Sequence, residues 1–142
     1  MKILFPGSFD PITVAHENLV RRALRLFDEV VVAVGVNSDK NYMFSVPQRV
    51  EMARKVFENE PRVSVVHYSD MTVDCCHRVG AQCILRGVRN VKDMEYEQTV
   101  AAVNHSLAPD IETLILYADP DMVDVSSTVV RERLLHDQAN KC

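Results

Sequence analysis

The stretch PGSFDPITVAH, residues 6–16, joins an expected strand to an expected helix and decides how the chain folds. Residues 3–5 form a short apolar run typical of a buried strand, and apolar positions then recur at helical spacing through residue 27. Thr13 is expected to cap this helix, where free backbone N–H groups and the helix dipole favour phosphate. Because helical side chains lean toward the N-terminus, His16 is expected to donate a hydrogen bond to that phosphate. The plain alternative is a half-buried histidine at the end of an apolar face.

The composition is that of an ordinary globular protein with one domain, residues 1–142. Hydrophobic residues make up 47% and charged residues 25%, with a net charge of −4 that argues against nucleic-acid or membrane affinity. No apolar run approaches bilayer length and no signal peptide precedes residue 6, so we expect a cytoplasmic protein. The cysteines fit neither a zinc site nor a redox pair and are expected as reduced thiols: Cys75, Cys76, Cys83 and Cys142.

Strand and helix signals alternate along the rest of the chain. Strands are expected at 3–5, 30–36, 63–68, 83–85 and 112–117, and helices at 14–27, 46–58, 73–79, 91–107 and from Ser126 or Ser127 to about 136, with a frayed tail to Cys142. Capping-box spacing from Ser45 and a cap at Asp70 are expected to open the second and third helices, and Gly80 to end the third. The alternation predicts a doubly wound, Rossmann-like α/β fold, with five parallel strands and helices on both faces.

Candidate ligand-binding residues follow every expected strand, where a doubly wound fold binds its ligands. They are Ser8 and Phe9 after the first strand, Lys40 after the second, Met71 and Thr72 after the third, Arg86, Gly87 and Arg89 after the fourth, and residues 119–128 after the fifth. The cations Lys40, Arg86 and Arg89 have no obvious partner in the sequence. We therefore expect one cationic site at this edge of the sheet.

Two of these segments have chemistry suited to phosphate. Arg86 and Arg89 flank Gly87, so guanidinium forks can bind oxygens bidentately while glycine lets the backbone approach closely. Residues 126–128 are three consecutive hydroxyl residues at an expected helix start, where side chains and free N–H groups can hold phosphates. The plain alternatives are a solvated turn and an ordinary serine cap. Arg131, one turn further, is expected to reach the phosphates or to pair with Glu132 or Asp124.

Three motifs together resemble a known family. Residues 7–16 resemble the (T/H)xGH signature of the nucleotidyltransferase superfamily, residues 86–97 resemble an RGxRxxxDxEYE segment, and residues 125–131 resemble an ISSTxxR motif. Within the superfamily they are most similar to phosphopantetheine adenylyltransferases, over residues 3 to about 133. This resemblance implies transfer of the adenylyl group of ATP to 4′-phosphopantetheine, giving 3′-dephospho-coenzyme A and pyrophosphate. It also implies Mg²⁺ held by ATP phosphates without a protein metal site, coenzyme A as a feedback ligand, and a homohexamer.

The resemblance assigns roles residue by residue. The catalytic residues are His16, Lys40 and Arg89. The acceptor phosphate and arm would contact Ser8, Lys40, Thr72 and Arg86. ATP would contact Ser8, Phe9, His16, Gly87, Val88, Arg89, Glu97, Met122, Val123, Asp124, Val125, Ser126, Ser127 and Thr128. For Glu97 the plain alternatives are an exposed helix face or pairing with Lys92 or Arg89.

Two departures from the family pattern stand out. Ala15 replaces the signature glycine, and its methyl group occupies space where a phosphate or adenine would approach the backbone. The C-terminus lacks much of the final helical segment that family members often carry, which concerns assembly more than chemistry. Two other functions stay open: another small nucleotidyltransferase, of the cytidylyltransferase or nicotinamide mononucleotide adenylyltransferase type, or a non-catalytic protein that binds nucleotide or coenzyme A.

Overall fold

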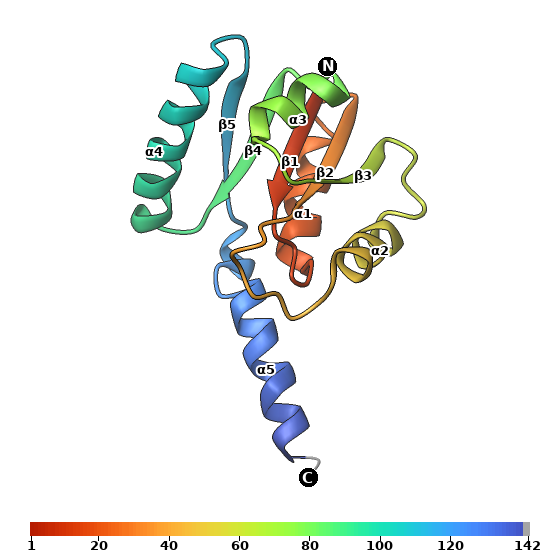
Figure 1. Ribbon diagram of the computed structural model, residues 1–142. Coiled ribbons are helices and arrows are strands. Elements are labelled where there is room, and N and C mark those ends of the chain that lie inside the picture. Colours follow the sequence, from red (N-terminus) through yellow and green to blue (C-terminus); the bar gives the residue numbers. More distant parts are fainter. Residues whose placement is uncertain (141–142) are drawn as a thin grey trace.

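The computed structural model describes residues 1–140, which form a five-stranded sheet flanked by helices (Figure 1). All neighbouring strands are parallel, in the order β3-β2-β1-β4-β5. The strands are β1 (Lys2–Gly7), β2 (Glu29–Gly35), β3 (Val63–Tyr68), β4 (Cys83–Val88) and β5 (Glu112–Tyr117). The predicted doubly wound fold is confirmed, and each predicted strand is present.

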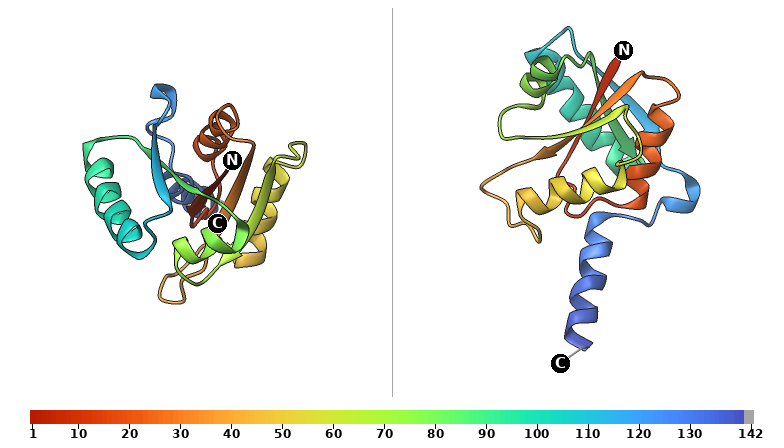
Figure 2. Two further views of the ribbon diagram at one scale, coloured as in Figure 1. Left: turned by 90° about the horizontal axis from the view of Figure 1, so that it is seen from above. Right: turned by 90° about the vertical axis from the view of Figure 1, so that its right-hand side faces the viewer.

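Helices cover both faces of the sheet, as the alternation of side chains along the strands requires. One face, which includes Ile3 and Val32, packs against α1 (Val14–Ala23) and α2 (Val46–Val56). The other face, which includes Leu4, packs against α3 (Thr72–Val79) and the residues after α4 (Val91–Leu107) (Figure 2). Strands buried on both sides explain the continuous apolar runs in the sequence.

The strand order reverses between β1 and β4. From β1 the chain winds outward through β2 to β3, then crosses back over the sheet and continues through β4 to β5. The loops after β1 and β4 therefore diverge and leave a crevice at the carboxyl ends of these two strands. The predicted ligand-binding segments meet at this edge.

Local capping signals were read correctly for three helices. Thr13 and Ser45 each form a capping box, and Gly80 ends α3 with a left-handed φ of 77°. Asp70 does not cap α3 as predicted, because its carboxylate binds Arg78 at 2.6 Å.

Several predicted boundaries shift, among them that of β4, which runs to Val88 rather than to residue 85. Helix α1 ends at Ala23 rather than at residue 27, in a turn that leads directly to β2. The last helix, α5 (Ser127–Asn140), begins as predicted but is longer, and the tail residue Cys142 lies outside the described residues. Figure 1 and the right-hand view of Figure 2 show α5 projecting from the carboxyl edge of the sheet, away from the other helices. Within residues 1–140, no helix combines the length and apolar character needed to cross a membrane.

Candidate active site

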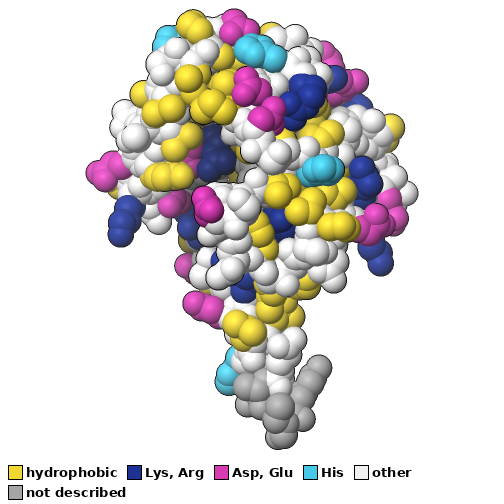
Figure 3. Space-filling model, in the orientation of Figure 1, with side chains coloured by type: hydrophobic (Ala, Val, Ile, Leu, Met, Phe, Trp, Pro, Cys, Tyr) yellow, Lys and Arg dark blue, Asp and Glu magenta, His cyan; other side chains and the backbone are white. Residues whose placement is uncertain are grey.

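Two neighbouring cavities open at the carboxyl edge of the sheet. The first, of about 380 Å³, lies between the ends of β1 and β4 and the starts of α1 and α5, and the second, of about 690 Å³, lies between the ends of β1 and β3 and helix α4. Both volumes suit small-molecule ligands. They share Pro6, Gly7, Ser8, Arg86 and Tyr96 as a common wall. In Figure 3, basic side chains lie in the hollow between α4 and the sheet.

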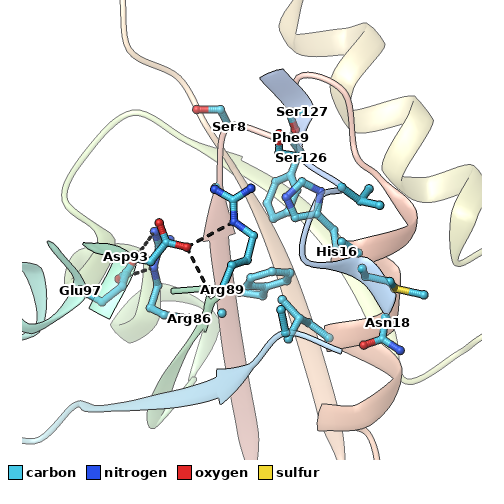
Figure 4. Close-up of a pocket in the computed structure, with 18 of the residues that line it drawn as sticks. Ser8, Phe9, His16, Asn18, Arg86, Arg89, Asp93, Glu97, Ser126 and Ser127 are labelled. Carbon is cyan, nitrogen blue, oxygen red and sulfur yellow. Dashed lines mark hydrogen bonds and ion pairs between the residues drawn. The ribbon is translucent and has the colours of Figure 1, made fainter. Parts of the chain in front are cut away.

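His16 lines the first cavity and is held by its own helix cap. Its Nδ1 accepts a hydrogen bond from the Thr13 backbone N–H at 3.0 Å, and its ring packs edge-on against Phe9 (Figure 4). Burial, with the nearby Arg86 and Arg89 charges, lowers the pKa of His16 to about 4. The imidazole is therefore neutral near pH 7, and since Nδ1 is an acceptor, the proton resides on Nε2. The predicted donor role is available to this neutral ring.

Arg86 stands in the shared wall and is held by a buried carboxylate. Its Nε and Nη2 each donate to an oxygen of Glu97 at 2.8 Å, and its Nη1 donates to the Pro6 carbonyl at 2.9 Å. Burial disfavours the cation, yet the Glu97 carboxylate raises the pKa of Arg86 above its usual value. This bidentate pair leaves part of the guanidinium for ligand. Glu97 thus pairs with neither Lys92 nor Arg89, and its helix position is buried rather than exposed.

Arg89 is also paired, which corrects the expectation that these cations have no partners. Its Nε donates to Asp93 at 3.2 Å, and the same carboxylate oxygen accepts the Arg89 backbone N–H (Figure 4). Lys40, by contrast, is exposed and makes no ion pair with any residue that the structure describes. One of the three cations is therefore free, and two are fixed in place.

The second cavity brings together all four residues assigned to the acceptor: Ser8, Lys40, Thr72 and Arg86. They come from four different loops or strand ends, which the sheet order places side by side. The Tyr68 hydroxyl lies 3.1 Å from the Thr72 hydroxyl and fixes that side of the cavity. The arrangement suits a phosphate at the Ser8 and Arg86 end with a longer chain beyond it.

The start of α5 closes the first cavity. Ser126 caps the helix, its Oγ accepting from the Val129 backbone N–H at 3.2 Å, and the Ser127 hydroxyl donates to the Pro11 carbonyl at 2.7 Å. Both serines line the cavity, as do Met122 and Val125.

Some residues assigned to ATP lie elsewhere. Val88, Val123, Asp124 and Thr128 line neither cavity; the Val88 side chain is buried in the core. Arg131 lines neither cavity and pairs with neither Glu132 nor Asp124: it donates to the Asp10 carbonyl at 2.7 Å and to the Thr128 hydroxyl at 3.1 Å, and its Nη1 lies 3.9 Å from the Asp10 carboxylate. It thereby joins α5 to the turn after β1.

Gly87 also has a packing role that the sequence did not indicate. It belongs to β4 rather than to a turn, and a Cβ at this position would lie 2.5 Å from Leu19 of α1. The absence of a side chain leaves room for Leu19 of α1 against the strand. Gly87 also lines the first cavity.

Sequence reasoning missed several polar lining residues. Asn18 and Asp93 line the first cavity, Tyr42 and Asn104 line the second, and Tyr96 lines both. Asp93 and Tyr96 belong to the family-like segment 86–97, so the sequence did contain a signal for them. Asn104, in the fourth turn of α4, stands at a family-like position that suggested packing, whereas in the structure it lines the second cavity.

Comparison with known proteins agrees with this geometry. The cytidylyltransferase-like family model matches residues 4–133. The phosphopantetheine adenylyltransferase of Bacteroides fragilis is 48% identical over 133 residues, 94% of this chain and 88% of that protein. The protein of the same name from Bacteroides thetaiotaomicron is 44% identical over 137 residues, 96% of this chain and 90% of that protein.

A likeness to a solved structure supports the fold. A Vibrio parahaemolyticus protein assigned as a nicotinate-nucleotide adenylyltransferase has a TM-score of 0.68 at 16% identity, covering 96% of this chain and 87% of that one. The fold, the three motifs and the extent of the identity thus lead to one conclusion: the chain belongs to the phosphopantetheine adenylyltransferase family.

Proposed function

We propose that this protein transfers the adenylyl group of ATP to 4′-phosphopantetheine, giving 3′-dephospho-coenzyme A and pyrophosphate. The observation that carries the proposal is the pair of cavities that meet at Ser8 and Arg86. A nucleotide in one and a phosphorylated acceptor in the other would bring their phosphates together at this wall. In-line transfer needs that placement above all.

The nucleotide side would use fixed donors. His16 would donate from Nε2 to the α-phosphate as negative charge redistributes, since its neutral ring is oriented by Thr13. Arg89 and the α5 start with Ser126 and Ser127 would hold the departing pyrophosphate. Glu97 would act by orienting Arg86.

The acceptor side needs no general base. A phosphate monoester has a second pKa of about 6 and is already an anion near neutral pH. Lys40 and Arg86 would hold this attacking phosphate, with Ser8 beside it and Thr72 along the arm. Speed would then come from alignment and charge compensation rather than from proton removal.

We propose that magnesium arrives with the nucleotide, held by its phosphate oxygens and water, as this hard cation prefers. Its contribution would be to neutralise phosphate charge. Among residues 1–140, no group of three His, Cys, Asp or Glu side chains is placed to hold a metal ion. Of the carboxylates that line the first cavity, Glu97 and Asp93 are paired with arginines and Asp119 accepts a backbone N–H, so cations, hydroxyls and N–H groups remain for the phosphates.

The proposal also covers the oligomeric state of the protein and its location in the cell. The family resemblance implies a homohexamer in the cytoplasm with coenzyme A as a feedback ligand. Exposed apolar side chains on α4 and on the edge strand β5, such as Val103, Leu107 and Tyr117, offer surface that a second copy would cover. Light scattering at six times the chain mass of 16.1 kDa would support the hexamer.

A paired-substrate assay tests the function. Pyrophosphate release is measured with ATP and 4′-phosphopantetheine, then with CTP in place of ATP, and with nicotinamide mononucleotide as acceptor. We expect pyrophosphate release with ATP and phosphopantetheine and with neither of the other two substrate pairs. Preference for another pair would indicate a different nucleotidyltransferase, and tight ATP or coenzyme A binding without release would indicate a non-catalytic protein.

A further inference from the structure

Arg49 of α2 is a fully buried cation that no part of the function above uses. Its side chain is 1% exposed, and it makes no ion pair within the described chain. Its guanidinium instead lies over the Tyr42 ring, 3.8 Å from the centroid, and donates to backbone carbonyls. A buried charge without a counter-ion is costly, so this arrangement calls for a reason.

The three carbonyls belong to segments at the edge of the two cavities. Nη1 donates to Ser8 at 2.8 Å and to Gly35 at 2.9 Å, and Nε donates to Phe44 at 3.2 Å. Ser8 is in the shared wall, Gly35 ends β2 and lines the second cavity, and Phe44 closes the loop that carries Lys40. One side chain therefore binds the turn after β1 to the loop after β2.

The bond to Ser8 fixes the orientation of one peptide group. In a trans peptide the C=O and N–H point in opposite directions, and the Ser8–Phe9 peptide is trans. The Ser8 carbonyl points to Arg49, which lines neither cavity, so the Phe9 N–H points to the other side. Ser8 and Phe9 both line the first cavity, and the Phe9 N–H makes no hydrogen bond with any described residue.

The backbone at Phe9 makes the opposite orientation attractive. Its φ of 47° lies in the left-handed region, which bulky residues rarely adopt. Rotating the Ser8–Phe9 peptide plane by half a turn would take the φ of Phe9 out of the left-handed region. The same rotation would turn the Ser8 carbonyl toward the cavity and replace a donor by an acceptor where phosphate is expected.

We propose, building on the function proposed above, that Arg49 is a positioning residue for the nucleotide: by holding the Ser8 carbonyl inside the protein, it keeps the Phe9 N–H aimed at a phosphate of ATP. Arg49 touches neither substrate. It acts through a main-chain group next to a residue held in the left-handed region.

The test measures ATP binding without the reaction. MgATP is titrated calorimetrically into the wild type, Arg49→Met, Arg49→Lys and Arg54→Met, at a temperature where the thermal unfolding curve of each shows folded protein. Arg54→Met is the matched control, since Arg54 lies on the same helix and donates to the Val65 carbonyl away from the cavities. In parallel, the Phe9 amide resonance is followed as ATP is added.

We expect Arg49→Met to bind ATP about tenfold to a hundredfold more weakly, the loss expected for a hydrogen bond to a charged group. Arg49→Lys should fall between it and the wild type, and Arg54→Met should match the wild type. The Phe9 amide should shift with ATP in the wild type but not in Arg49→Met. If Arg49→Met does not fold, the ATP affinity and the Phe9 amide shift of Arg49→Lys are compared with those of the wild type instead.

ATP affinity within threefold of the wild type together with a normal Phe9 shift, in whichever Arg49 variant folds, would overturn the role of Arg49. A loss of affinity that Arg54→Met shares would also overturn it, because it would reflect general destabilisation. A wild type that binds ATP but releases no pyrophosphate with phosphopantetheine would overturn the proposed function alone. A wild type that binds no ATP would overturn both.

Discussion

The two cavities that meet at Ser8 and Arg86 hold their charges in different ways. Arg86 in the shared wall is paired with Glu97, and in the first cavity Arg89 is paired with Asp93 and His16 is neutral. In the second cavity Lys40 is exposed and free of ion pairs among the described residues. The nucleotide side is thus aligned before any ligand binds, whereas the acceptor side offers a mobile point charge. We infer that catalysis depends on alignment at the first cavity and on charge at the second.

The sharpest test of this contrast is His16→Ala. Losing one well-aimed donor costs about 2.7–4 kcal/mol of barrier, so kcat should fall about a hundredfold or more. The KM for phosphopantetheine should change little, because His16 lines only the first cavity. Steady-state kinetics test this, with circular dichroism as the control for folding. A kcat within threefold of the wild type would remove His16 from the mechanism.

The role of charge at the second cavity is tested with Lys40→Ala. A hydrogen bond to a charged group contributes about 1.5–3 kcal/mol, so kcat/KM for phosphopantetheine should fall about tenfold to a hundredfold. ATP affinity, measured by calorimetry, should stay near the wild-type value. Lys55→Ala, an exposed lysine on α2, is the matched control. Equal losses for both substrates would contradict the division of labour between the cavities.

The neutral state of His16 predicts a pH dependence of stability. Its pKa is about 4 in the folded protein and 6.5 in the unfolded chain, so the unfolded state binds the additional proton between these values. The contribution of His16 to stability is therefore complete above pH 6.5 and is lost as the pH falls toward 4. Denaturant unfolding of the wild type and His16→Ala across this range should show it. An NMR titration that places the ring pKa at 6 or above would contradict it.

The smallest effect is expected from Ala15→Gly. The methyl group of Ala15 lines the first cavity, so removing it should raise kcat/KM for ATP by a few-fold at most. Glycine is less favourable than alanine in a helix, so stability should fall by up to about 1 kcal/mol. Kinetics with ATP and with phosphopantetheine, beside thermal unfolding, separate the two effects. A change confined to phosphopantetheine would place Ala15 outside the nucleotide site.

Much of the fold was predictable because its signals are local. The apolar runs of β2 and β3, the capping boxes at Thr13 and Ser45, and Gly80 all act within a few residues. Asp70 failed as a cap because an oppositely charged side chain eight residues away, Arg78, binds its carboxylate. Local propensity identifies a capable residue but not the partner that it finds.

The features of the candidate site likewise fall into those that local sequence predicts and those that depend on distant contacts. Order along the chain and the rule for parallel sheets were enough to bring Ser8, His16, Lys40 and Arg86 to one edge, because carboxyl ends of parallel strands meet there. Which charges are paired, which nitrogen of His16 carries the proton and why Gly87 has no side chain depend on contacts between distant segments. The burial of Arg49 depends on such contacts too, and nothing in the sequence distinguishes Arg49 from the exposed arginines of the helices. The packing of α1, α2 and α4 on the sheet decides which residues become partners. Packing joins residues that are far apart in the sequence, so no local sequence pattern predicts it.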